Sequence, residues 1–245
     1  MDRSISRTDP VLVAGAGGFI GGWLVRHLRE NGFTTIRAVD IKPFDEWYQQ
    51  HPDVDNRIAD LRSLEACNEA VDGVGHVYNL ACDMGGMGFI EANKAACMVS
   101  VLINTHLLLA GKEAGVRRHF LSSSACIYNI NLQQLSDVTA LREEDAYPAM
   151  PEDGYGWEKL FSERMCRNFR DDYGIETRVA RYHNVYGPHG TYEGGREKAP
   201  AAICRKVAAA KLAGERDIEI WGEAPEQGTN ARALDRGCGA AAFAE

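Results

Sequence analysis

One pair of side chains has the types and the spacing that proton exchange with an alcohol requires. Tyr155 and Lys159 stand four residues apart in the segment YGWEK, so on a helix the phenol and the ammonium share a face. A nearby cation favours the phenolate, which lowers the pKa of the tyrosine and lets it act as a base when an alcohol is oxidised by hydride transfer. A Y-x-x-x-K pair is also common by chance on helix surfaces, so the residues around it decide the interpretation.

A serine-rich segment, SSSACIY at 122–128, supplies two more candidates. The residues before it read as a buried parallel strand, and such a strand typically opens into small polar residues where it reaches a ligand. Ser124 would then help Tyr155 to orient a substrate oxygen. A cysteine at the end of a buried strand usually belongs to the core, but Cys126 continues from Ser124 toward the predicted site, which favours a catalytic thiol.

A glycine turn near the start of the chain is the third signal. The segment VLVAGAGGFIGGWL has its glycines in a G-x-x-G-x-x-G spacing between a predicted strand and a predicted helix. Glycines allow a tight turn and a close approach of the backbone, so a pyrophosphate can sit on the helix N-terminus. The predicted cofactor contacts in this turn are Gly15, Gly18, Phe19, Ile20 and Gly21.

Two acidic residues extend the prediction of a dinucleotide site. Asp40 ends the next predicted strand, about where a ribose-binding acid is needed. A carboxylate there accepts hydrogen bonds from a ribose diol and repels a 2′-phosphate, so NAD is favoured over NADP. A capping role for Asp40 is the alternative, but it does not explain the glycines. Asp60, after the third predicted strand, would reach the adenine, although alone it reads as a helix cap.

These residues need a scaffold in which strands and helices alternate. Hydrophobic periodicity and turn residues predict strands at 11–14, 34–40, 57–61, 76–81, 118–125, 177–185 and 218–221. The same signals predict helices at 19–30, from 63, within 90–114, at 155–173 and at 199–213. This alternation indicates an α/β fold, a Rossmann-like doubly wound parallel sheet with helices on both faces.

The composition of the 245-residue chain is ordinary for a soluble enzyme, with 45% hydrophobic and 25% charged residues. A formal charge of −8 argues against a general nucleic-acid binder. No apolar stretch looks long enough to span a bilayer and residues 1–10 lack a signal-peptide core, so we expect a cytoplasmic protein without membrane attachment. The seven cysteines form no C-x-x-C pair and no metal-like cluster, which indicates reduced thiols and no metal site.

Together, the glycine turn, the serine-ended strand and the Y-x-x-x-K pair resemble the extended short-chain dehydrogenase/reductase family, and within it the nucleotide-sugar epimerases and dehydratases. Three stretches narrow the resemblance: NLACDMGGMGFI at 79–90, SSSACIY at 122–128, and RYHNVYGPHGTYEGGREKAPAA at 181–202, which ICRK follows. They are similar to the GDP-mannose 3,5-epimerase family, which converts GDP-mannose to GDP-L-galactose. The resemblance runs from about Val11 to Gly222. It implies NAD as cofactor, GDP-mannose as substrate, and a homodimer formed through the long helices within 90–114 and 155–173.

The resemblance also implies a division of roles. Tyr155 and NAD would oxidise the sugar at C4, and the resulting ketone would acidify the protons at both C3 and C5. Inversion needs a group on each face of the ring, and Cys126 would be the base and Lys198 the acid. Their solution pKa values, about 8.5 and 10.4, are close enough to neutrality for a site to tune. Lys159 would also bind the nicotinamide ribose, whereas Lys198 alone reads as a solvated residue before a helix near Pro200.

Several further substrate contacts are implied by the resemblance alone, and each has a plainer explanation. A strand-end asparagine and helix-surface charges need no ligand, and a buried methionine in a loop is commonly packing. His183 lies between aromatic residues on a predicted strand, so it reads as a core histidine. The implied substrate contacts are Gly85, Met87, Ser124, Asn184, Glu197, Lys198 and Lys206.

We predict three segments in the domain organisation. An NAD-binding Rossmann domain covers 1–175, and a mixed segment over 176–222 completes the sheet and starts a substrate domain. The tail over 223–245 is rich in Ala and Gly without periodicity, so we expect it to be disordered. The family would continue well past Gly222, so the resemblance predicts an incomplete C-terminal substrate domain in a truncated or altered chain.

Three other interpretations remain open. A nucleotide-sugar 4-epimerase would share the chemistry at C4 but needs no acid/base pair beside C3 and C5. A 4,6-dehydratase would be expected to carry an acidic pair where this chain has Ala125 and Cys126. The third possibility is a catalytically silent NAD-binding fragment, in which the cover that excludes water from a keto intermediate is missing.

Overall fold

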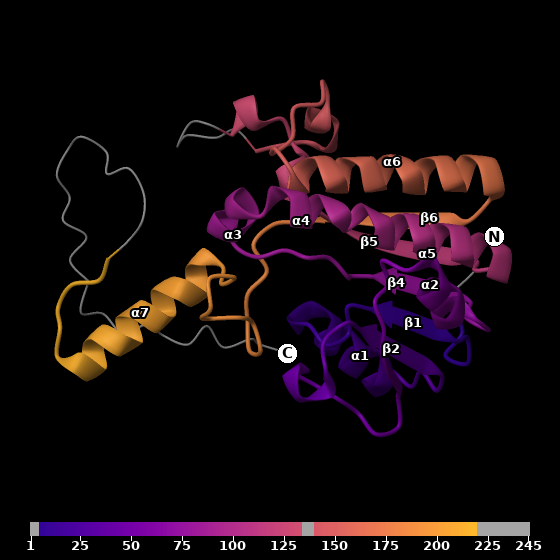
Figure 1. Ribbon diagram of the computed structural model, residues 1–245, viewed down its shortest axis with the longest axis horizontal. Helices are drawn as coiled ribbons and strands as arrows, with labels where there is room; N and C mark the ends of the chain where they lie inside the picture. The colour runs from indigo at the N-terminus through magenta and orange to yellow at the C-terminus, as the bar shows by residue number, and fades with distance from the viewer. Residues whose placement is uncertain (1–4, 134–139, 220–245) are drawn as a thin grey trace.

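The computed structural model describes residues 5–133 and 140–219, which are organised around a parallel sheet (Figure 1). Six strands lie in the order β3-β2-β1-β4-β5-β6, and every neighbouring pair is parallel. The strand order reverses between β1 and β4. Ligands bind open α/β sheets at such a switch point, outside the carboxyl ends of the strands. The predicted α/β fold with a doubly wound parallel sheet is confirmed.

Strands and helices alternate along the chain. The strands are β1 (Val11–Ala14), β2 (Ile36–Asp40), β3 (Asp55–Ile58), β4 (His76–Asn79), β5 (Arg118–Ser124) and β6 (Glu176–Tyr182). The helices are α1 (Phe19–Glu30), α2 (Leu64–Val71), α3 (Met87–Ala92), α4 (Lys94–Val99), α5 (Val101–Ala114), α6 (Tyr155–Tyr173) and α7 (Ala199–Ala213). A short 3-10 helix, η2 (Ala125–Ile127), follows β5 directly.

Alternate residues of the central strands face two separate cores. Leu12 of β1 packs with Cys67 of α2 and Leu107 of α5 on one face of the sheet. Val13 of β1 packs with Val25 of α1 on the other. Successive side chains of a strand point to opposite faces, so a strand that is covered on both sides reads as a continuous apolar run. This is why VLVA in β1 is apolar throughout.

Two predicted elements differ from the structure for identifiable reasons. β3 covers Asp55–Ile58 rather than 57–61, because it pairs with β2 in a register that sets Asp55 opposite Arg37, whose Nε donates to the Asp55 carboxylate at 2.9 Å. The single helix expected within 90–114 forms as α3, α4 and α5. Asn93, with φ −131° and ψ 38°, has left the helical conformation and separates α3 from α4.

The last predicted strand is not formed in the part that the structure describes. Ile218 and Glu219 belong to no helix or strand, and the other two residues of 218–221 lie outside the described residues. The tail over 223–245 also lies outside them. β6 does complete the sheet, but the predicted division into three segments stays a prediction.

One helical stretch contradicts the expectation that no apolar segment is long enough to span a bilayer. Among the described residues, Lys94–Ala114 has the length and composition of a membrane-crossing helix, with a mean hydropathy of 1.4. This stretch contains α5, whose Leu107 and Leu108 are almost inaccessible to solvent because they pack into the cores of the sheet. The core helix of a sheet protein meets the same criteria, and 44% of the apolar window is buried inside the structure.

After β6 the chain leaves the sheet and leads to α7. Figure 1 shows α7, in yellow, beyond the end of the sheet where α3 begins and apart from the helices that flank the strands. Residues of the connecting segment, 183–198, line one cavity with Gly15 after β1 and Leu80 after β4, so this segment reaches the switch point.

Candidate active site

A cavity of about 870 Å³ lies at the carboxyl ends of the strands. Its lining comes from the segments that follow the strands and from the start of α6. A crevice in this place is the expected ligand site of an open parallel sheet, and its volume is within the range of cofactor pockets. The predicted site residues that line it are Gly15, Gly18, Phe19, Ile20, Gly21, Asp40, Asp60, Gly85, Ser124, Tyr155 and Lys198.

The glycine turn leaves no room for side chains. Gly15 has a φ of +84°, and a Cβ atom there would lie 2.8 Å from the backbone of Leu80 and Ala81. A Cβ atom on Gly21 would lie 2.0 Å from the Gly15 carbonyl oxygen. The N-cap residue Gly18 provides no side-chain cap, so N–H groups at the start of α1 remain for an anion. The turn therefore fits the pyrophosphate of a dinucleotide.

Asp40 fits the ribose of that dinucleotide. Its carboxylate accepts hydrogen bonds from the N–H groups of Gly17 at 3.0 Å and Lys42 at 3.1 Å, which hold it beside the glycine turn. Each carboxylate oxygen keeps a lone pair for a further donor, such as a ribose hydroxyl. Asp60 is less available, because Arg62 pairs with its carboxylate at 2.7 Å and the hydrogen bond lowers the pKa of Asp60.

The tyrosine and lysine lie at the start of α6, as their spacing predicts. Tyr155 is buried and lines the cavity, and Lys159 Nζ lies 5.5 Å from the centroid of the Tyr155 ring. Burial raises the pKa of Tyr155 well above its ordinary value, and Cys82 and Glu158 raise it further. The expected lowering of this pKa is therefore wrong for this structure. The main physical reason is the burial of the phenol, to which the neighbouring Glu158 carboxylate adds.

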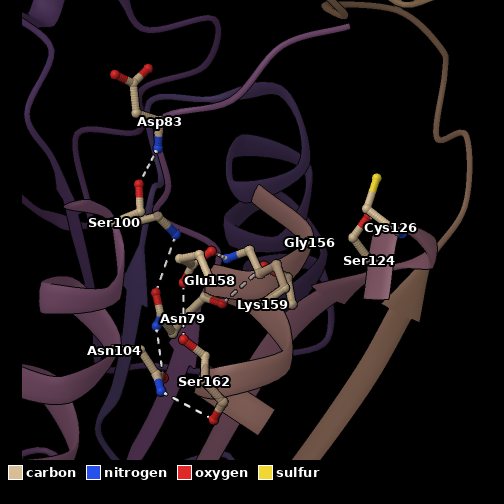
Figure 2. Close-up of polar contacts among 12 residues, drawn as sticks. Asn79, Asp83, Ser100, Asn104, Ser124, Cys126, Gly156, Glu158, Lys159 and Ser162 are labelled. Atoms are coloured by element: carbon tan, nitrogen blue, oxygen red, sulfur yellow. Dashed lines mark hydrogen bonds and ion pairs between the residues drawn. The ribbon is translucent and has the colours of Figure 1, made fainter. Parts of the chain in front are cut away.

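Glu158 is a residue that the sequence pattern did not single out. Glu158 Oε2 lies 3.3 Å from Lys159 Nζ, and Oε1 accepts a hydrogen bond from Ser162 Oγ at 2.9 Å (Figure 2). Burial alone would lower the pKa of Lys159, but Glu158 outweighs it, so the pKa of Lys159 is raised. Lys159 lies behind Tyr155 and not in the cavity lining. Its proposed contact with a ribose stays a prediction.

Ser124 ends β5 and Cys126 lies in the following η2, and the two residues differ in their surroundings. Ser124 lines the cavity, and its Oγ accepts a hydrogen bond from the Cys126 N–H at 3.2 Å. Cys126 packs against a cluster formed by Ile90, Cys97 and Tyr155, and it is not in the cavity lining. Figure 2 shows its sulfur pointing away from the buried polar chain. A catalytic role for Cys126 therefore stays a prediction.

Two loops that are far apart in the sequence meet beside the cavity. A Cβ atom on Gly86 would lie 2.4 Å from the Glu197 carbonyl oxygen, and the Gly86 N–H donates to the Arg196 carbonyl oxygen at 3.1 Å. Arg196 Nη1 also donates to Asp83 Oδ1 at 2.6 Å. The stretches D-M-G-G-M-G-F and G-G-R-E-K therefore form one structural unit. This unit brings Lys198 into the cavity lining.

Four implied substrate contacts lie outside the cavity lining. Met87 is exposed at the start of α3, and the structure places Met84, not Met87, at the cavity. Asn184 is exposed beyond β6. Glu197 pairs with an arginine of α7, and Lys206 donates to a backbone carbonyl group. Substrate roles for all four residues stay predictions, because they depend on contacts that the sequence pattern alone cannot place.

The cavity also contains residues that sequence analysis did not select. Ser123 is 2% exposed, and its Oγ has no hydrogen-bond partner among the described residues. The serine run at the strand end was the available signal for it. His183 lines the cavity, against the expectation of a core histidine, because β6 ends at Tyr182. The other missed lining residues that matter here are Cys82, Met84 and Arg196.

Comparison with known proteins gives one family and several relatives. Residues 11–234 match the NAD dependent epimerase/dehydratase family. The chain is 45% identical to GDP-mannose 3,5-epimerase 1 of Oryza sativa subsp. japonica and 43% identical to GDP-mannose 3,5-epimerase of Arabidopsis thaliana. Each alignment covers 87% of this chain and 55% of the relative. The chain thus spans about half the length of these curated relatives.

Solved structures with the same fold include two sugar-nucleotide epimerases. UDP-glucose 4-epimerase from Thermotoga maritima, solved with UDP-glucose, has a TM-score of 0.73 at 23% identity and covers 87% of this chain and 66% of its own. The UDP-glucose 4-epimerase of Thermus thermophilus, solved in complex with NAD, has a TM-score of 0.69 at 23% identity, over 85% and 64% of the two chains. At this identity the likeness supports the fold alone.

Proposed function

The chain belongs to the NAD dependent epimerase/dehydratase family, and from this premise we propose that it binds NAD in its cavity and epimerises a nucleotide sugar. The uncapped N-terminus of α1 fits the pyrophosphate, and Asp40 fits the ribose diol. When bound there, NAD would supply a reversible hydride acceptor for an alcohol carbon of the sugar. The protein would supply the proton transfers.

Tyr155 and Ser124 are the residues proposed to act at C4 of the sugar. Both line the cavity, and Tyr155 is the buried phenol at its edge. Ser124 Oγ would donate a hydrogen bond that orients the C4 oxygen, and Tyr155 would accept the proton of the C4 hydroxyl group as the alcohol becomes a ketone. The ketone acidifies the neighbouring C–H groups, so protons at C3 and C5 become exchangeable. Return of the hydride and the proton completes the cycle.

We propose GDP-mannose as the substrate and GDP-L-galactose as the product. The observation that carries this proposal is the joined pair of loops around Gly86 and Arg196, which brings Lys198 into one cavity with Tyr155. Cys126 would remove a proton from one face of the ring, and Lys198 would deliver a proton to the opposite face. The names of the relatives at 43–45% identity support this substrate.

A 4-epimerase is the second candidate, and the position of Cys126 favours it. Cys126 lies outside the cavity lining, and a 4-epimerase requires no acid/base pair beside C3 and C5. Product analysis separates the candidates. The full chain with NAD is incubated with GDP-mannose, and in a second reaction with UDP-glucose, and the sugars are identified by NMR. We expect GDP-L-galactose from the first reaction. Conversion of UDP-glucose to UDP-galactose, with GDP-mannose unchanged, would contradict the 3,5-epimerase proposal.

We further propose that the protein is a cytoplasmic homodimer. The six described cysteines are free thiols, as is usual in a reducing compartment. Helices α5 and α6 lie side by side (Figure 1). They expose large apolar side chains, a pattern that marks interaction surfaces. Those residues are Leu102, Leu109, Trp157 and Phe161, with Met98 and Val99 on the adjoining α4.

A further inference from the structure

A buried carboxylate lies directly behind the catalytic tyrosine. Glu158 is 2% exposed, and its Oε2 makes no hydrogen bond among the described residues, although it lies 3.3 Å from Lys159 Nζ. Its other oxygen is fixed by Ser162 Oγ. A buried carboxylate costs free energy unless an ionic partner compensates for it. The contact with Lys159 therefore explains how the buried Glu158 can carry a negative charge.

Among the groups that face Lys159 and Tyr155, Glu158 is the one that supplies a negative charge. Lys159 is faced by Glu158, by Cys82 after β4 and by Cys166 of α6. Tyr155 is faced by Cys82, Glu158 and Cys126 of η2. Burial raises the pKa of the Cys82 thiol and raises that of Cys166 to about 12, so both thiols are neutral near pH 7.

We propose that Glu158 is a positioning residue, the counter-ion that keeps Lys159 in its charged form beside Tyr155. The inference rests on the proposed function, because Lys159 matters to the reaction as the partner of Tyr155. In a buried site without a carboxylate, desolvation favours the neutral amine. A neutral amine does not stabilise a phenolate, so Tyr155 would be a poorer acceptor for the C4 hydroxyl proton.

A matched pair of variants separates the charge of Glu158 from its hydrogen bond. Glu158→Gln removes the charge, while the glutamine carbonyl oxygen can still accept from Ser162. Ser162→Ala removes the hydrogen bond and keeps the charge. Both variants and the unaltered full chain are labelled with 13C at the lysine Cε atoms and then compared. NMR titration then follows each lysine, and loss of a signal in Lys159→Met identifies Lys159.

We expect Lys159 to titrate at a lower pH in Glu158→Gln than in the unaltered chain, and Ser162→Ala to leave that titration unchanged. An unchanged Lys159 titration in Glu158→Gln overturns the proposal, even if activity falls. The alkaline limb of the pH–rate profile should move to lower pH in Glu158→Gln alone. A loss that is equal at every pH would instead indicate a merely structural role.

A failure of the proposed function is distinguishable from a failure of this inference. If the unaltered chain epimerises no sugar, the proposed function fails, and the Lys159 titration still decides the role of Glu158. If Glu158→Gln does not fold well enough for NMR, thermal unfolding replaces the NMR titration. The two proteins compared are Glu158→Gln and the double variant that also carries Lys159→Met. Because the buried Lys159 has lost its counter-ion in Glu158→Gln, we expect the double variant to unfold at a higher temperature than Glu158→Gln. Equal or lower stability of the double variant overturns the proposal.

Discussion

At the scale of single residues, a buried histidine stands in the polar cluster under the active site. His119 of β5 is 2% exposed, and its Nε2 donates to Asn104 Oδ1 at 3.1 Å. Asn104 Oδ1 also accepts from Asn79 Nδ2 at 3.2 Å, and Asn104 Nδ2 donates to the Ser162 carbonyl oxygen at 3.4 Å. Figure 2 shows the contacts of Asn79 with Asn104 and of Asn104 with Ser162 of α6. Burial lowers the pKa of His119 from 6.5 to about 4.

This lowered pKa predicts that the protein loses stability in acid. Between pH 6.5 and 4 the unfolded His119 binds a proton that the folded one does not, so the free energy of unfolding falls with pH by up to roughly 3 kcal/mol in this window. Urea denaturation at several pH values measures it. His119→Gln should flatten this dependence, whereas replacing the exposed His27 should not. If the free energy of unfolding depends on pH equally in both variants, His119 is not the source of the loss of stability in acid.

At the scale of elements, two glycines of the turn before α1 should differ in how well they tolerate a side chain. A Cβ atom at Gly21 would meet the Gly15 carbonyl oxygen at 2.0 Å, whereas one at Gly18 would meet it at 3.3 Å. Forcing a methyl group into a packed site costs about 1–3 kcal/mol. Gly21→Ala should therefore lower the free energy of unfolding by about that amount without NAD, and Gly18→Ala by less. Thermal unfolding that shows the same loss for both would contradict the packing of this turn.

The contacts that join the loops around Gly86 and Arg196 should affect sugar binding but not cofactor binding. The Arg196 guanidinium pairs with Asp83 and lies 3.9 Å from the centroid of the Phe89 ring. An ion pair of this exposure and a cation–π contact together contribute about 1–2 kcal/mol. Arg196→Gln should weaken GDP-mannose binding roughly 5–30-fold in calorimetry. Binding of NAD should stay unchanged.

A surface ion pair of similar length supplies the control for this prediction. Arg26 and Glu30 pair at 2.7 Å on the exposed side of α1, so Arg26→Gln should leave both affinities unchanged. Loss of NAD binding in Arg196→Gln would show that the loops support the whole cavity and not the sugar end alone.

The sequence predicts elements well where the signals are local. α6 and α7 have the predicted bounds, and each ends at a glycine with positive φ, Gly174 at +74° and Gly214 at +72°. The pairing of Glu158 with Lys159 was not predictable, because it depends on burial by elements far away in the sequence. The contact of Gly86 with Glu197 likewise depends on how the chain returns after β6.

At the scale of the whole molecule, the exposed apolar side chains of α5 and α6 predict self-association. Phe161 is 52% exposed on α6. Phe161→Glu should shift the protein from dimer to monomer in analytical ultracentrifugation, because a carboxylate is costly to bury in an apolar interface. Leu212→Glu, at an exposed position of α7, is the matched control and should leave the dimer intact. A monomeric unaltered chain, or a dimeric Phe161→Glu variant, would contradict the proposed interface.

The central claim is that one cavity oxidises C4 and exchanges protons at C3 and C5, and deuterium incorporation tests it most directly. The full chain is incubated with NAD and GDP-mannose in D2O, and the recovered sugar is analysed by NMR and mass spectrometry. We predict deuterium at both C3 and C5, and its loss in Cys126→Ser and in Lys198→Met while NAD remains bound. Recovered sugar without deuterium at either carbon, from a chain that binds both NAD and GDP-mannose, would contradict the account.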